Sequence, residues 1–181
     1  DELERLKEAA KRLADEVKEH VDRSRENAKR LKEEVEEHVK RLEDVARTMD
    51  EEVKRRGDDR VVKRLREILK KLHEESERTI RRMRRNLEEN HRRTEESKKR
   101  LRDKLEELKR RLEKFKEDGV DKESVDRVLK EIEDIVRRLE ERLDESNKEL
   151  KEIVDDVTEK LERVNRKIAE IVKRLSDEIR K

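Results

Sequence analysis

Apolar residues recur in steps of three and four along three successive stretches of the chain. This spacing returns side chains to one face of an α-helix, so it predicts three amphipathic helices. About two positions in every seven are apolar, which fits one ring of three helices around a shared core. The positions expected in that core are Leu3, Leu6, Ala10, Leu13, Val17, Val21, Leu31, Val35, Val39, Leu42, Val45 and Met49; Val62, Leu65, Leu69, Leu72, Ile80, Met83, Leu87, Leu101, Leu105, Leu108, Leu112 and Phe115; and Val125, Val128, Ile132, Ile135, Leu139, Leu143, Leu150, Ile153, Val157, Leu161, Val164, Ile168, Ile171, Leu175 and Ile179.

The two glycines of the chain divide it into thirds of similar length. Gly57 and Gly119 are each expected just past a helix end, where the backbone turns left-handed and glycine does so at the least cost. The predicted helices therefore span about 2–56, 59–118 and 122–181. Because loops this short join antiparallel neighbours, we expect an all-α fold. It is an up-down-up antiparallel three-helix bundle of long, nearly straight helices, coiled-coil-like, forming a single domain over residues 1–181.

The residues that follow each glycine support these boundaries. Asp58 and Asp59 can cap the N-terminus of the second helix, and Asp121 can cap the third. Val120 is placed for the apolar contact that often accompanies a glycine cap.

Small polar residues interrupt the apolar strips, and some of them repeat at one interval. Two histidines lie 18 residues apart in the first helix and two in the second, and two asparagines do so in the third. Eighteen residues make five helical turns, so each pair returns to the same side of its helix. The candidate network residues are His20, Ser24, Asn27, His38, His73, Ser76, Thr79, Asn86, Asn90, His91, Thr94, Ser97, Ser146, Asn147 and Asn165.

Folding the chain at its two loops gathers these residues into two layers. The antiparallel pairing of the first two helices sets His20 opposite Thr94 and His91, and Ser24 opposite Asn90. The same pairing sets His38 opposite Ser76 and His73.

The third helix adds asparagine to both layers. Asn147 is expected near His20 and His91, with Ser146 beside it, and Asn165 near His38, His73 and Ser76. A buried donor without a partner costs about 1–3 kcal/mol, so such layers favour one register of the helices over others.

Composition narrows the class of protein. Sixty per cent of the residues are charged, 29% are apolar, and Phe115 is the single aromatic residue. Such a chain is disordered or a long helical protein, and the helical period decides for the second. No stretch alternates like a strand, and two glycines are too few for phosphate loops, which excludes an α/β enzyme. With a net charge of +2, the chain as a whole is not built to attract nucleic acid or membranes.

Sharper functions have little support in the sequence. Each layer offers two imidazoles, but zinc needs three or four good ligands and no core Cys, Asp or Glu accompanies them, so we expect no metal and no cofactor. The His20–Ser24 and His73–Ser76 pairs lack an orienting carboxylate, which argues against an enzyme. The second helix is basic, but glutamates interrupt the charge and no aromatic platform is present for bases. The tripeptide at 56–58, Arg-Gly-Asp, spells the integrin-binding motif but lies at a helix end.

The regularity of the chain resembles computational design. Its surface is almost wholly Glu, Lys and Arg, its helices are of equal length, and its polar layers are duplicated. It resembles the de novo parametric helical bundles with buried hydrogen-bond networks. His20, His38, His73 and His91 carry a likeness to the pH-responsive members of that family.

The resemblance implies a designed scaffold without natural biochemical activity, expected as a soluble monomer that needs no partner. A self-associating or partner-binding bundle is the alternative. Acid is expected to weaken the fold, because burial disfavours imidazolium and protonation turns a ring acceptor into a donor. Whether the histidines serve acid switching or register is left open by the sequence.

Overall fold

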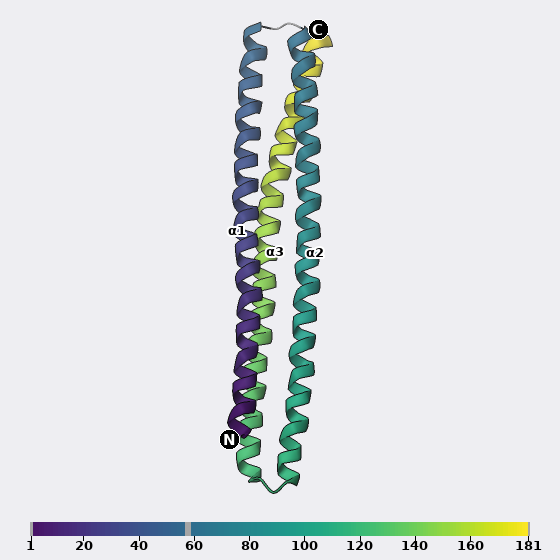
Figure 1. Ribbon diagram of the computed structural model, residues 1–181. Coiled ribbons are helices and arrows are strands. Elements are labelled where there is room, and N and C mark those ends of the chain that lie inside the picture. The colour runs from purple at the N-terminus through teal and green to yellow at the C-terminus, as the bar shows by residue number, and fades with distance from the viewer. Residues whose placement is uncertain (1, 57–58, 181) are drawn as a thin grey trace. The chain divides into compact units, whose positions relative to one another are not determined.

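The computed structural model describes residues 2–56 and 59–180, which form three long helices (Figure 1). They are α1 (Glu2–Arg56), α2 (Asp59–Glu117) and α3 (Lys122–Arg180), and the described residues include no strand. The expected all-α three-helix bundle is confirmed. Helix α2 ends one residue earlier than expected. No helix in the described part has a stretch long and apolar enough to cross a membrane.

Contacts divide the chain into two compact units, and every helix contributes to both. Unit 1 contains residues 1–27 and 88–150, and unit 2 contains residues 28–87 and 151–181. Within each unit α1 and α3 run in the same direction and α2 runs the opposite way (Figure 1). Parallel α1 and α3 are joined at a constant offset of 124 residues, by Arg25–Glu149 in unit 1 and Lys160–Glu36 in unit 2. The single domain over 1–181 stays a prediction.

The core of each unit comes from the predicted apolar strips. In unit 1, one cluster gathers Leu6, Ala10, Leu108, Leu112, Val125 and Ile132, and a second gathers Val17, Val21, Leu101, Val136, Leu139 and Leu143. In unit 2, Val35, Leu42, Leu69, Met83, Leu161 and Ile168 are buried. Every expected core side chain that the structure describes is buried or half-buried, and that of Ile179 lies outside the described residues.

The apolar faces are wider than the predicted strip. Ala28, Ala46, Val136 and Val154 are also buried. Each of these two pairs repeats at the interval of 18 residues, so the repeat extends through the apolar core as well as the polar positions. The narrow-strip interpretation was wrong on this point, because small Ala and β-branched Val complete the sides of the strip where helices approach.

The loop after α2 shows why glycine stands there. Gly119 has a φ of 86°, in the left-handed region. Its N–H donates to the Lys116 carbonyl at 3.2 Å, and the Val120 N–H donates to the Phe115 carbonyl at 3.0 Å, the two bonds of a Schellman cap. Val120 remains 37% exposed, so it is only partly covered.

Asp121 begins α3 as expected. Its carbonyl accepts the Val125 N–H at 3.1 Å, and its carboxylate accepts the Ser124 hydroxyl at 3.0 Å. The expected roles of Gly57 and Asp58 in the first loop lie outside the described residues.

Candidate functional site

In unit 1 a chain of hydrogen bonds links all three helices. His20 Nε2 on α1 lies 3.3 Å from the hydroxyl of Thr94 on α2, and that hydroxyl donates to the Asn90 carbonyl at 2.9 Å. The side-chain Nδ2 of Asn90 donates to Asn147 Oδ1 on α3 at 3.0 Å. Asn147 Nδ2 lies 3.3 Å from His91 Nδ1, which closes the chain back onto α2.

The direction of these bonds fixes which ring nitrogens carry protons. Thr94 has one hydroxyl proton and gives it to the Asn90 carbonyl, so its oxygen must accept from His20 Nε2–H. Asn147 accepts through its oxygen and therefore donates through Nδ2, which requires a lone pair on His91 Nδ1. His20 is thus a donor in this network, and His91 is an acceptor.

In unit 2 the second layer is sparser. The Ser76 hydroxyl donates to the Leu72 carbonyl at 3.0 Å and lies 3.4 Å from His38 Nε2, so it accepts from that nitrogen. Thr79 donates to the Glu75 carbonyl at 2.9 Å within its own helix. The His38–Ser76 bond is therefore the link between helices in this layer that matches the expected pairing.

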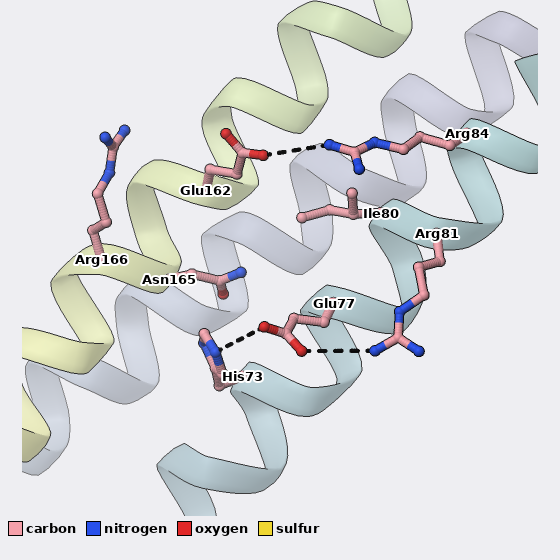
Figure 2. Close-up of a pocket in the computed structure, with 8 residues that line it drawn as sticks. All are labelled: His73, Glu77, Ile80, Arg81, Arg84, Glu162, Asn165 and Arg166. Carbon is pink, nitrogen blue, oxygen red and sulfur yellow. Dashed lines mark ion pairs between the residues drawn. The ribbon is translucent and has the colours of Figure 1, made fainter.

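His73 faces a different partner from the one expected. Its Nε2 lies 3.2 Å from Glu77 Oε1, one turn along α2 (Figure 2). Its Nδ1 is buried without a hydrogen bond, and so is Asn165 Oδ1 across the pocket that both residues line. The layer brings His73 and Asn165 to one place, as expected, but both atoms are acceptors when the imidazole is neutral.

Burial lowers the pKa of two histidines below the ordinary value of 6.5. For His20 the main cause is burial, and the positive charges of Arg93 and Arg23 lower the pKa further. For His38 burial again dominates; Glu75 opposes the decrease and Arg41 adds to it. Both residues are thus held as neutral imidazoles to a lower pH than in an unfolded chain.

Several predicted members lie outside the buried layers. Asn27, Asn86 and His91 are exposed, which corrects the expectation that they fill the core strip. The neighbouring residues Ala28, Leu87 and Asn90 take the inward positions, and one residue is a rotation of about 100° on a helix.

Other members are in place but lack a partner. Ser24 and Ser146 are buried in unit 1, yet their hydroxyl oxygens have no hydrogen bond within the described residues. Ser97 is half-buried and lines a pocket with His20. The expected Ser24–Asn90 pairing is not formed, because Asn90 turns to Asn147 instead.

Sequence reasoning missed Glu77 as the partner of His73. Their spacing of four residues on one helix was the available signal, since such pairs face each other. Within the described part of the chain, no group of three or more His, Cys, Asp or Glu side chains is arranged to hold a metal ion.

The fold defines the class of protein as a three-helix bundle. A solved structure described as a "Computationally designed three helix bundle" is similar, with a TM-score of 0.52, 21% sequence identity, and coverage of 99% of this chain and 92% of that one. At this identity the likeness concerns the fold. No protein-family model and no curated protein matches the sequence.

Proposed function

We propose that this protein is a designed structural scaffold, without enzymatic activity, whose helices are held in register by two polar layers. The hydrogen-bond chain of unit 1 carries the proposal, because it joins all three helices and gives each side chain a defined donor or acceptor role. The regular charged surface, the repeat of 18 residues and the designed origin of the similar structure support it. We further propose that the buried histidines make the scaffold sensitive to acid.

The physical basis of the register is a penalty for displacement. A shift of one helix by a turn separates Asn147 from Asn90 and places amides against apolar side chains. Each buried polar group left unpaired costs about 1–3 kcal/mol, whereas an apolar layer of similar size can slide at less cost.

Spin-label distances test this role directly. Labels at Arg25→Cys and Glu149→Cys occupy facing positions of α1 and α3 in unit 1, whose native side chains lie 3.2 Å apart. In an otherwise native chain we expect one narrow distance. In a chain that also carries His20→Leu, Asn90→Leu, Thr94→Val and Asn147→Leu, we expect a broader or second distance, displaced by about one turn of 5.4 Å.

The apolar chain is expected to stay folded, since replacing both members of buried polar pairs is often neutral or stabilising. One narrow and unchanged distance in that folded chain would refute the register role.

A further inference from the structure

A surface pocket in unit 2 combines a buried amide with several guanidinium groups. It lies between α2 and α3 and has a volume of about 560 Å³ (Figure 2). Its floor holds Ile80 and Asn165, which are 8% and 7% exposed. Arg81 and Arg84 stand on the α2 side, and Arg166 stands on the α3 side.

The arginines of the pocket retain hydrogen-bonding capacity. Arg84 lies 3.8 Å from Glu162 and Arg81 lies 3.7 Å from Glu77, both longer than an N–H···O hydrogen bond. Within the described residues Arg166 has no ion pair, and Figure 2 shows its side chain at the rim. Several N–H donors are therefore available around one opening.

The amide of Asn165 is an independent sign of a ligand. Its Oδ1 is buried and has no hydrogen bond within the described part of the chain, in a pocket that offers it no donor. Because Oδ1 makes no bond, a half-turn of the amide loses none and directs Nδ2–H toward the same opening. The side chain can thus add a donor to those of the arginines.

The balance of charge selects the class of ligand. Three arginines face two carboxylates, so the lining is positive even when His73 is neutral. A divalent cation is disfavoured by this charge, although His73 and Glu77 by themselves are capable ligands. Guanidinium groups bind oxyanions through paired N–H groups, which favours a doubly charged anion with several oxygens.

We propose that this pocket binds a small tetrahedral oxyanion of the sulfate or phosphate class, held by Arg84, Arg166 and the amide of Asn165. The site is independent of the register role of the polar layers.

Titration of the ¹⁵N-labelled protein with sodium sulfate tests the proposal, with sodium chloride adjusted to hold ionic strength constant. We expect the side-chain resonances of Asn165, Arg84 and Arg166 to move together and saturate with one dissociation constant. Arg166→Gln should weaken that binding about tenfold, the size of one charge-assisted hydrogen bond. The matched control is Arg138→Gln, an exposed arginine of unit 1 away from the pocket, which should leave the dissociation constant unchanged.

Both arginines are on the surface, so their replacement is expected to preserve helicity, which circular dichroism verifies. Shifts that never saturate, or that chloride alone reproduces, would overturn the proposal. So would equal affinity in the parent, Arg84→Gln and Arg166→Gln proteins.

Discussion

At the scale of single residues, the sequence located the partners but not the direction of their bonds. The pairing of His20 with Thr94 and of His38 with Ser76 follows from helix geometry alone, and the structure has both. Which nitrogen donates depends on where each hydroxyl sends its one proton. Both hydroxyls donate to a carbonyl four residues earlier in α2, so both histidines donate through Nε2.

This direction changes the expected effect of acid. The sequence suggested that protonation would break an acceptor bond at every histidine. Protonation leaves the Nε2–H bonds of His20 and His38 in place, and the acceptor bond that it removes is the one from Asn147 to His91. For His20 and His38 the penalty is the burial of charge.

The bond between Asn90 and Asn147 is the most direct link between α2 and α3 in the network. A double-mutant cycle of Asn90→Ala and Asn147→Ala should give a coupling of about 1 kcal/mol in the free energy of unfolding, typical of one hydrogen bond. The control cycle pairs Asn147→Ala with Asn27→Ala, an exposed asparagine, and should be additive within about 0.3 kcal/mol. Denaturant unfolding of the variants measures both, and equal couplings would contradict the network.

At the scale of elements, periodicity and glycine positions predicted the three helices, because local rules set where a helix runs and ends. The width of the packed faces was less predictable. Ala28 and Val154 are buried because neighbouring helices approach them, and this depends on tertiary packing rather than on local spacing.

The cap after α2 allows a clean test of one local rule. Gly119→Ala should destabilise the protein by about 1 kcal/mol, the usual cost of a left-handed conformation for a residue with a Cβ. No atom lies within 4 Å of the position that this Cβ would take, so the effect is backbone strain alone. Gly119→Asn should lose less, since asparagine tolerates this region better. Guanidinium midpoints rank the three proteins, and an alanine variant as stable as the parent would show that the cap is not strained.

At the scale of the whole molecule, the sequence predicts one domain and one chain. Each helix runs through both units without a break, which supports a single folding domain over residues 1–181. Each unit contains its own apolar core and one polar layer, so neither depends on a second chain for its described contacts.

We expect the protein to sediment as a monomer of 22.2 kDa across micromolar concentrations. Ile68 is 37% exposed beside a pocket lined by Val45, Met49, Val61 and Leu65, which is the apolar surface best placed for self-association. A mass of two or three chains that increases with concentration would contradict the monomer and favour the self-associating alternative.

The central claim is that buried polar layers containing histidine govern how this bundle responds to its surroundings. The lowered pKa values of His20 and His38 mean that the unfolded chain binds more protons than the folded one. Their contribution to stability is therefore intact above about 6.5 and is lost as the pH falls from there through the lower folded-state pKa.

Guanidinium midpoints at pH 7.5 and pH 5 measure this most directly, in the parent and in a variant with His20, His38, His73 and His91 all replaced by glutamine. The surface carboxylates are the same in both proteins. We predict that the parent midpoint decreases between the two pH values by clearly more than that of the variant. Equal decreases would show that the carboxylates, and not the buried histidines, set the response to acid.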